Sequence, residues 1–366
     1  MNQRELSCLF QLLSVPGIGP TRVRALIGHF QLAEAALAAP VPRLCQVEGI
    51  DQTLAENIQQ AKVGERLAQQ QLAWAQRYHT RVVTFWDEDF PASLKKIYDP
   101  PALLFIKGEL RVEDELAIAV VGTRAPSEYG KLATERLTAG LAGARLTIVS
   151  GLARGVDTIA HQTALKSGGR TVAVLGSGLD HIYPGENCRL AQQIAQHGAV
   201  ITEYLFGTKP EAVNFPRRNR LISGLTLGTL VIEAGEQSGA LITANTALEQ
   251  SREVFAVPGN IFSPKSLGPH RLIQEGAKLV TCVEDILAEL SPQLSLFAQS
   301  PTPTPPIQLN EIEQKVVALL SHEPVHIDLL AKQTGLVTAR LLAILLELEF
   351  KNVVKQLPGK FFVRLR

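Results

Sequence analysis

The sequence predicts an α/β protein with a large parallel-sheet domain, an N-terminal helical domain and a C-terminal winged helix. Three observations predict this fold. Short apolar segments alternate with helical stretches from about residue 80, helical patterns broken by glycine turns precede them, and the last part reads helix, helix, helix, strand, strand. The expected domains are residues 1–75, 80–290 and 309–366, with a linker at 291–308.

Composition is that of an ordinary soluble protein. The 366 residues are enough for two or three domains, and 46% are hydrophobic while 19% are charged. The net charge of +1 requires any anion-binding surface to be local. The N-terminus lacks the pattern of a signal peptide, and no apolar run approaches the ~20 residues that span a bilayer. We therefore expect a cytoplasmic protein without membrane contact.

Cysteine spacing predicts neither a disulfide framework nor a metal site. Cys8, Cys45, Cys188 and Cys282 are far apart and form no CxxC pair. Isolated cysteines usually pack as small hydrophobic residues, so we expect four buried free thiols in a reducing compartment and no bound metal.

The N-terminal domain holds one short motif. Gly17-Ile18-Gly19 follows an apolar residue and precedes a helical pattern carrying Arg22 and Arg24, and a weaker turn lies within VEGIDQTLAENI at 47–58. This order is typical of a helix-hairpin-helix, in which the helix start after the turn can face a phosphate. A purely structural pair of helices explains the same pattern equally well, and both interpretations stay open.

Eight apolar segments of strand length define the central domain. They are RVVTFW (81–86), ALLFIKG (102–108), LAIAVVG (116–122), RLTIVSG (145–151), TVAVLGSG (171–178), GAVITEY (198–204), LGTLVIEAG (227–235) and EVFAVPG (253–259). Helical stretches such as 129–144 and 240–251 separate the later ones. Near-continuous apolar strands alternating with helices indicate a parallel sheet covered on both faces, whose ligands bind beyond the carboxyl ends of the strands.

The C-terminal part begins after a segment rich in Pro, Ser and Gln at 291–308, which we interpret as a linker. Residues 309–366 then give three helices and two strands around a Pro-Gly turn, the order of a winged helix. Such modules bind DNA or proteins. Glu347 and Glu349 on the expected recognition helix favour a protein contact.

Several expected strands end in turns that could bind an anion. Small residues let a backbone approach a ligand, and a helix start offers N–H groups and partial positive charge. One such turn alone is weak evidence for an anion site, but several turns at one edge of one sheet favour an extended anionic ligand. The candidates are Gly122, Thr123 and Arg124; Ser150, Gly151, Arg154 and Gly155; Gly176 and Gly178; Ser238 and Gly239.

Two competing nucleotide motifs are missing from the sequence. No clean GxGxxG opens a helix, and no GxxxxGK[ST] is present. A nicotinamide cofactor and ATP hydrolysis are therefore not expected, and no other cofactor is predicted. Neither His161 nor His181 has a serine or cysteine partner recognisable in the sequence, so no catalytic residue is assigned.

The densest positive charge lies in FPRRNRLISG (215–224). Arg217, Arg218 and Arg220 stand close together with no acid in the segment, and Asn219 could reach a base edge or orient an arginine. Arginine binds phosphate through a planar fork and can stack on bases. Phe215 could stack on a base, although core packing is the commoner role. Together with Arg124 and Arg154, the cluster predicts a positive track for a single nucleic-acid strand.

Five segments, in their order along the chain, closely resemble the DNA-processing protein A family (DprA, also called Smf). They are SGLARGVDTIAHQTAL, AVLGSGLDHIYPGEN, FPRRNRLISG, EAGEQSGALITANTALEQSREVFAVPG and LIQEGAKLV. The likeness runs from about residue 85 to 290, and the outer parts resemble the family's helix-hairpin-helix or sterile-alpha-motif-like domain and its winged helix. The resemblance implies a non-enzymatic protein that binds single-stranded DNA on an extended Rossmann-like parallel sheet domain. It further implies a homodimer through that domain that loads a RecA-type recombinase during natural transformation.

The family's motifs transfer position by position. Its Gly-Ser-Arg turn corresponds to residues 122–124, its Ser-Gly-Leu-Ala turn to 150–153 and its Arg-Asn-Arg element to 218–220. Two departures stand out. Gly185 and Glu186 follow the YP pair where some members have lysine, with Arg189 as a possible substitute. His270 stands where Asn is frequent. It lies within residues 261–273, the segment that we expect to form the dimer face.

Two other functions compete with this interpretation. A nucleotide phosphoribohydrolase of the lysine-decarboxylase-like group shares a Rossmann-like fold, and Glu233 would be its acid, but EAGEQSGALITA lacks that group's PGGxGTxxE arrangement. A scaffold that binds through the winged helix alone is the third possibility.

Overall fold

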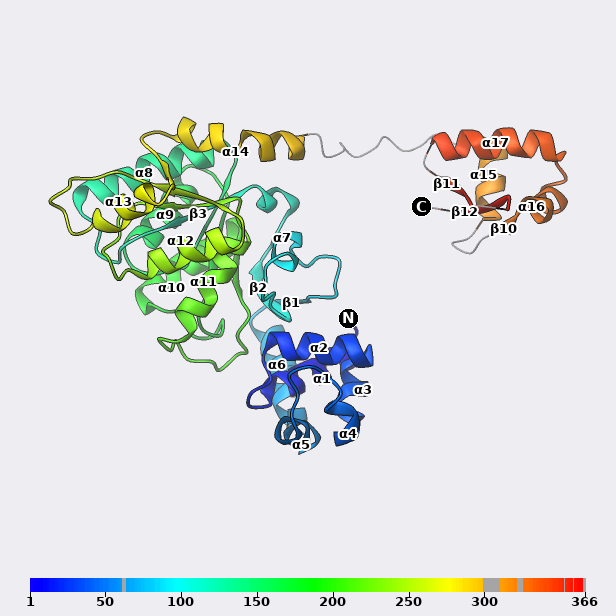
Figure 1. Ribbon diagram of the computed structural model, residues 1–366, viewed down its shortest axis with the longest axis horizontal. Coiled ribbons are helices and arrows are strands. Elements are labelled where there is room, and N and C mark those ends of the chain that lie inside the picture. Colours follow the sequence, from blue (N-terminus) through cyan, green and yellow to red (C-terminus); the bar gives the residue numbers. More distant parts are fainter. Residues whose placement is uncertain (61–63, 299–309, 321–324, 352, 358, 365–366) are drawn as a thin grey trace. The chain divides into compact units, whose positions relative to one another are not determined.

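The computed structural model describes residues 1–60, 64–298, 310–320, 325–351, 353–357 and 359–364. They form two compact units, Met1–Leu294 and Ser295–Arg366. Figure 1 shows the helices and strands of each unit.

Helices alone build the N-terminal part of the first unit. They are α1 (Gln3–Ser14), α2 (Pro20–Phe30), α3 (Ala33–Ala38), α4 (Val41–Leu44), α5 (Gln52–Gln60) and α6 (Gly64–Arg77). Asn2 caps α1 by accepting a hydrogen bond from the Glu5 N–H at 2.8 Å. The turn to α2 needs Gly17 at φ +85°, a conformation that favours glycine, and Pro20 suits the first turn of α2 because no helical N–H is required there.

A sheet of nine strands fills the centre of this unit, in the order β1-β2-β6-β5-β4-β3-β7-β8-β9. The strands are β1 (Arg81–Thr84), β2 (Leu103–Gly108), β3 (Ala117–Val121), β4 (Thr147–Ser150), β5 (Thr171–Val174), β6 (Ala199–Thr202), β7 (Gly228–Val231), β8 (Glu253–Ala256) and β9 (Lys278–Leu279). The predicted parallel sheet is confirmed from β6 to β9, where every pairing is parallel. Apolar runs reveal burial and not direction, so they did not distinguish β1 and β2, which extend the sheet with antiparallel pairings.

Helices cover both faces of the sheet (Figure 1). The connections are α7 (Ala92–Lys95), η2 (Val112–Glu115), α8 (Glu128–Gly143), α9 (Val156–Lys166), η3 (Gly185–Asn187), α10 (Cys188–His197), α11 (Asn214–Gly224), α12 (Gly239–Glu249), α13 (Leu267–Gln274) and α14 (Val283–Ala298). Helices α8, α9 and α10 pack on one side, whereas α11, α12 and α13 pack on the other. Because β4 to β6 and β7 to β9 extend from β3 in opposite directions, the sheet is doubly wound.

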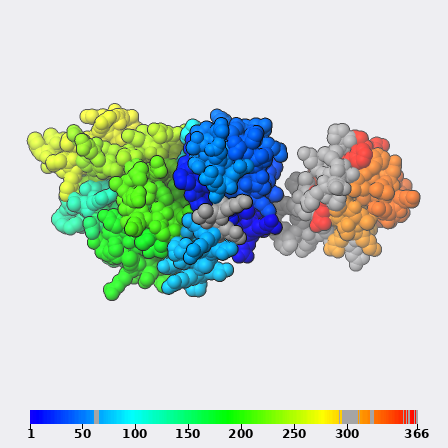
Figure 2. All heavy atoms as spheres, turned by 90° about the horizontal axis from the view of Figure 1, so that it is seen from below, coloured from blue at the N-terminus to red at the C-terminus, as the bar shows by residue number. Residues whose placement is uncertain are grey.

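The N-terminal helices share a hydrophobic core with the sheet domain. Phe10 of α1 stacks on Phe105 of β2 with ring centroids 5.8 Å apart, and Phe206 packs edge-on against Phe105 at 5.0 Å. The buried Gln71 amide of α6 bonds both the N–H and the carbonyl of Phe206, at 2.8 and 3.1 Å. In the space-filling view the blue N-terminal helices lie directly against the green sheet domain (Figure 2). The two predicted domains 1–75 and 80–290 are therefore one packed unit.

The second unit has the element order of a winged helix. It comprises α15 (Glu311–Ala318), β10 (Val325–His326), α16 (Ile327–Thr334), α17 (Thr338–Phe350), β11 (Val354–Leu357) and β12 (Phe361–Arg364), with an antiparallel sheet ordered β10-β12-β11. Leu330, Leu341, Leu345 and Phe362 are buried in its own core. The predicted linker was placed too early, because α14 continues through Ala298; the rest of it, 299–308, lies outside the described residues.

Within the described ranges no single helix is long and apolar enough to cross a membrane, and only the pair α16 and α17, bent by 107°, meets that length and composition together.

The cysteines differ from the expectation of four buried thiols. Cys8 is buried among the N-terminal helices, Cys282 is half-buried, and Cys45 and Cys188 are exposed. Burial of a single cysteine depends on which side of its turn or helix faces the core, and Cys188 begins α10 on the outer side.

Candidate nucleic-acid interface

One small pocket brings together residues from several predicted turns. It is lined by Arg124, Gly151, Ala153, Arg154, Tyr183, Pro184, Phe215 and Arg218. The turns after β3, β4 and β5 supply the first six, and α11 supplies the last two. The pocket therefore lies at the carboxyl edge of the parallel strands, where open α/β sheets bind ligands.

Arg218 forms the buried floor of this pocket. Only 5% of it is exposed, and its Nη1 donates to the carbonyls of Gly151, at 2.8 Å, and Val174. A Cβ at Gly151 would stand 2.6 Å from Arg218 Nη2, so glycine is required for the guanidinium to fit. Burial lowers the pKa of Arg218 to about 10, which leaves it charged at neutral pH.

A buried carboxylate, that of Asp157, lies behind the floor of the pocket. It accepts hydrogen bonds from the N–H groups of Gly151 and Ala153, at 3.0 and 3.3 Å. Burial raises the pKa of Asp157, and the charge of Arg218 opposes that rise. Because Asp157 and Arg218 offset each other, the positive charge available to a ligand comes mainly from the rim.

Two aromatic rings form the wall of the pocket. Phe215 and Tyr183 have centroids 5.8 Å apart at an angle of 42°, and 42% of Tyr183 is exposed. The guanidinium carbons of Arg124 and Arg218 each lie 5.9 Å from the centre of the Phe215 ring, within cation–π range. Phe215 is half-buried and lines the pocket, so its ring is placed where a base could reach it, and stacking on a base stays a prediction.

Arg124 and Arg154 form the rim, and both are exposed. Arg154 is paired with Glu186, which was not predicted: its Nε and Nη2 donate to the two carboxylate oxygens at 3.0 and 3.1 Å. The cavity behind the rim holds about 30 Å³, the room of roughly one water molecule. It can take a phosphate oxygen, whereas a base would have to stack outside it.

The arginine cluster of 217–220 does not form one continuous positive track. Successive residues of a helix point about 100° apart, so α11 turns Arg218 toward the pocket and Arg217 and Arg220 toward the other side. Arg217 is exposed. The expectation that Arg220 belongs to the positive track is wrong, because its Nη2 donates to Glu203 at 2.6 Å and its Nε lies 3.4 Å from Asp99.

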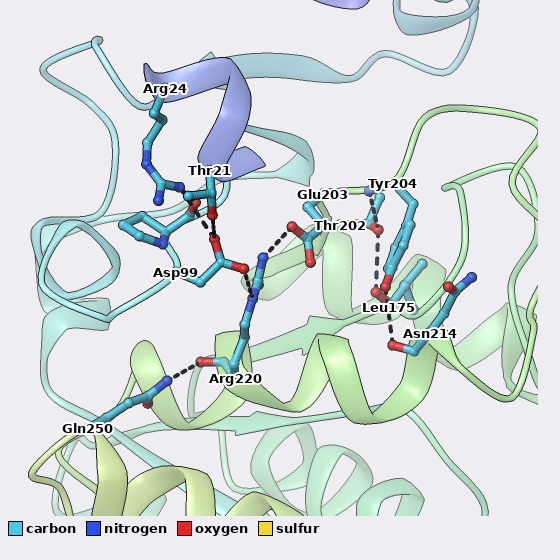
Figure 3. A network of polar contacts seen from close by, with 11 residues as sticks. Thr21, Arg24, Asp99, Leu175, Thr202, Glu203, Tyr204, Asn214, Arg220 and Gln250 are labelled. Atoms are coloured by element: carbon cyan, nitrogen blue, oxygen red, sulfur yellow. Dashed lines mark hydrogen bonds and ion pairs between the residues drawn. The ribbon is translucent and has the colours of Figure 1, made fainter. Parts of the chain in front are cut away.

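Figure 3 shows that Arg220 belongs to a polar network joining α11 to the N-terminal helices. Asp99 accepts a hydrogen bond from Thr21 at 2.7 Å and forms an ion pair with Arg24 at 3.6 Å, both on α2. Burial raises the pKa of Glu203, while the charge of Arg220 opposes that rise. Arg220 therefore fixes α11 against neighbouring elements and does not present a free charge.

Asn219 is likewise occupied inside the protein. It is 8% exposed, its Oδ1 accepts from Arg218 Nε at 3.2 Å, and its Nδ2 donates to the Gly239 carbonyl at 3.3 Å. The predicted role of orienting an arginine agrees with this contact, whereas direct access to a base does not. Ser238 caps α12 by accepting from the Ala240 N–H at 3.3 Å, and Gly239 opens that helix; neither lines the pocket.

Three of the backbone amides expected to face a ligand donate to protein acceptors instead. The N–H groups of Thr123 and Gly178 donate to the carbonyls of Glu233 and Thr208, at 2.7 and 2.9 Å, and that of Gly151 donates to Asp157. A side chain at Gly122 would contact Val156, and one at Gly178 would contact Asp180. Strand-to-helix turns need these bonds for their own geometry, so these three N–H groups are not available to an anion.

The remaining predicted glycines and Ser150 shape the pocket from behind. Gly155 has φ +76° at the start of α9, and a Cβ at Gly176 would stand 3.0 Å from the Phe215 ring. The hydroxyl of Ser150 is buried and donates to the Val120 carbonyl at 2.7 Å.

Glu233, the acid of the hydrolase alternative, has a structural role. It is buried, and its two oxygens accept from the N–H of Ser127, at 2.8 Å, and from the Ser127 hydroxyl at the start of α8. A Cβ at Gly130 would collide with the same carboxylate. A carboxylate that anchors a helix start in this way is not free to attack or protonate a substrate.

The arginines of the helix-hairpin-helix turn also serve the fold. Arg22 donates to the carbonyls of Gly17 and Gly49, at 2.7 and 2.8 Å, and so ties both hairpin turns together. Arg24 donates to the Pro100 carbonyl. These contacts support the structural interpretation of this motif.

Tyr183 and Pro184 line the pocket but were not predicted as site residues. Ala153 was expected only as part of the turn 150–153, and Glu186 only as a departure from the family, so its pairing with Arg154 is new. Tyr183 to Glu186 lie in AVLGSGLDHIYPGEN (173–187), and a tyrosine next to the glycine turn is the sequence signal for this aromatic wall. Arg189 is exposed on α10 and does not line the pocket, so its substitute role stays a prediction. His270 Nε2 lies 3.0 Å from the Gly259 carbonyl oxygen, which gives it a contact in the loop after β8.

Residues 81–291 match the family described as DNA recombination-mediator protein A. The chain belongs to this family. Residues 300–360 match the DprA winged helix domain, and residues 10–61 match a SAM-like helix-hairpin-helix tandem.

Curated relatives of this recombination-mediator family cover most of the chain. Protein Smf of Synechocystis sp. is 35% identical over 387 residues, covering 96% of each protein. DNA processing protein DprA of Bacillus subtilis is 48% identical over 204 residues, covering 56% of this chain and 69% of that protein.

Two solved DprA structures share the fold. The X-ray structure of DprA from Streptococcus pneumoniae aligns with a TM-score of 0.69 and 37% identity, over 79% of this chain and 98% of that one. DprA from Helicobacter pylori, whose structure is described as giving insight into its single-stranded DNA binding mode, aligns with a TM-score of 0.53 and 31% identity, over 59% and 98%. The predicted family and fold are therefore confirmed.

Proposed function

We propose that this recombination mediator binds single-stranded DNA at the pocket formed by Arg124, Gly151, Arg154, Tyr183, Phe215 and Arg218. The observation that carries the proposal is the meeting of two exposed arginines with two aromatic rings at the carboxyl edge of the sheet. Aromatic faces stack on any base and guanidinium groups bind any phosphate, so affinity should depend little on sequence. The Helicobacter pylori relative, with its single-stranded DNA binding mode, supports the same ligand.

We extend the proposal to the cellular role implied by the family. The bound strand would be protected and handed to a RecA-type recombinase during natural transformation in the cytoplasm, with the protein acting as a homodimer through the sheet domain. No chemical step belongs to this role. Light scattering measures the dimer, and the rate of recombinase assembly on an oligonucleotide, with and without the protein, measures the loading.

The DNA site is tested by fluorescence anisotropy with a labelled oligonucleotide across a salt series. Arg124→Ala should weaken binding and reduce the slope of log K against log salt by about 0.7, since one phosphate contact is lost. Phe215→Ala should weaken binding by about 1–3 kcal/mol with little change in slope, because stacking carries no charge. Double-stranded DNA should bind more weakly than single-stranded DNA.

A matched control comes from the opposite edge of the sheet. Arg111 is exposed and paired with Glu109, just beyond β2, so Arg111→Ala removes one positive charge far from the pocket. Equal losses in Arg111→Ala and Arg124→Ala would show a general charge effect, and unchanged binding in both pocket variants would refute the site.

A further inference from the structure

Glu186 is an acid placed at the mouth of an otherwise positive pocket. It lies in η3, two residues after Pro184, which lines the pocket, and its carboxylate holds Arg154, which lines it from the turn after β4. The side chains of Arg154 and Glu186 are each 56% exposed. The pair is therefore reachable by a ligand that enters the pocket.

The geometry of the Arg154–Glu186 pair determines which guanidinium donors a phosphate could reach. Glu186 binds side-on, with one oxygen 3.0 Å from Arg154 Nε and the other 3.1 Å from Nη2. That edge of the guanidinium is one at which arginine binds a phosphate through two parallel hydrogen bonds. A strand phosphate and the Glu186 carboxylate would compete for these donors.

The ion pair between Arg154 and Glu186 is not expected to contribute much to the stability of the fold. Ion pairs between exposed side chains contribute little to folding, because solvent screens them and two side chains lose freedom. The effect of Glu186 on a ligand would come through Arg154. Its carboxylate offsets the charge of Arg154, one of the two positive charges on the rim.

We propose that Glu186 is an acidic latch that sets the affinity of the pocket for single-stranded DNA by occupying Arg154 until a strand phosphate displaces it. The inference rests on the proposed function and deepens it. Each binding event exchanges the carboxylate for a phosphate on the same guanidinium. The latch makes bound DNA easier to release and reduces the salt dependence of binding.

The variant Glu186→Gln tests the latch in the full-length protein, with a labelled oligonucleotide in a salt series. The change keeps the size of an exposed side chain and removes its charge. We expect about two- to fivefold tighter binding at low salt, the range of a surface ion pair. The slope of log K against log salt should become steeper by up to about 0.7, since Arg154 then releases a counterion when it binds a phosphate.

A double-mutant cycle separates the latch from simple repulsion. In an Arg154→Gln background, Glu186→Gln should bring no gain, because the guanidinium that it frees is gone. Glu109→Gln is the matched control: Glu109 is also exposed and paired with an arginine, at the opposite edge of the sheet, and its loss should leave affinity unchanged. Equal unfolding midpoints of the variants verify that the fold is intact.

Two results would overturn the latch. In the first, Glu186→Gln binds the oligonucleotide as tightly as the wild type. In the second, Glu186→Gln still increases affinity in the Arg154→Gln background. Either leaves the DNA site standing if Arg124→Ala and Phe215→Ala still weaken binding. Failure of the proposed function looks different, because the wild-type protein would then not bind the oligonucleotide at this pocket at all.

Discussion

Arg218 illustrates how an almost fully buried residue can define a ligand site. Its guanidinium binds the Gly151 and Val174 carbonyls, lies near Asp157 and lies within cation–π range of the Phe215 ring. Removing it would leave the Asp157 carboxylate buried beside a void, a change of the kind that costs several kcal/mol. Arg218 is thus a positioning residue for the exposed rim.

His161 gives the protein a measurable sensitivity to acid. It is fully buried on α9, with Nδ1 2.6 Å from the Thr171 hydroxyl, and burial, followed by the charge of Arg218, lowers its pKa from 6.5 to about 3. Between pH 6.5 and about 3, His161 is protonated in the unfolded chain but stays neutral in the folded protein. The free energy of unfolding should therefore decrease by about 1.4 kcal/mol for each pH unit as pH falls from 6.5 toward 3.

His161→Gln should remove this contribution because the amide does not titrate. Between pH 7.5 and 4.5, the free energy of unfolding in urea should decrease by about 3 kcal/mol less in the variant than in the wild type. Comparing each protein with itself at two pH values cancels any constant cost of the substitution. Identical pH dependence in both proteins would contradict the low pKa.

At the scale of an element, α11 has different partners on its two sides. Phe215 and Arg218 face the pocket, and Arg220 faces Glu203, Asp99 and the N-terminal helices (Figure 3). The position of the ligand wall therefore depends on how the N-terminal helices hold the other side of the same helix.

Arg220→Gln should destabilise the first unit by about 3–5 kcal/mol, since it leaves Glu203 buried without its cation. Urea unfolding measures this loss. Arg217→Gln is the matched control: Arg217 is exposed one turn earlier, and its loss should change stability by no more than about 0.5 kcal/mol.

DNA binding by Arg220→Gln distinguishes a structural role from a ligand contact. Because Arg220 presents no free charge, the salt slope of binding should stay that of the wild type even if affinity falls. A slope reduced by about 0.7 would instead show a phosphate contact at this position.

The positions of the strands could be predicted from the sequence better than the side-chain contacts that each residue makes. Buried strands are near-continuous apolar runs, so β3 to β8 could be located, and the turns after them gave Arg124, Gly151 and Arg154 of the pocket. The side to which an arginine points depends on the helical phase of α11 and on Glu203, a residue on a different element. For that reason the burial of Arg218 and the internal ion pairs of Arg220 could not be predicted from the density of charge.

At the scale of the whole molecule, the two units differ in what they offer a nucleic acid. The exposed part of α17, the expected recognition helix, includes Leu342, Leu346, Glu347 and Phe350, the last of these 79% exposed. Apolar and acidic side chains suit a protein contact better than a phosphate backbone. The sheet unit, in contrast, holds the arginines and aromatic rings of the pocket.

Removal of the winged helix should therefore leave DNA binding intact. Residues 1–298 contain a compact unit with its own core and end where α14 ends. We expect this shortened protein to bind the labelled oligonucleotide within about twofold of the full chain, and with the same salt slope, because every proposed phosphate contact remains. Arg124→Ala in the shortened protein should weaken binding as much as in the full chain. A tenfold loss on truncation would move the principal DNA contact to the winged helix and leave the pocket a secondary role.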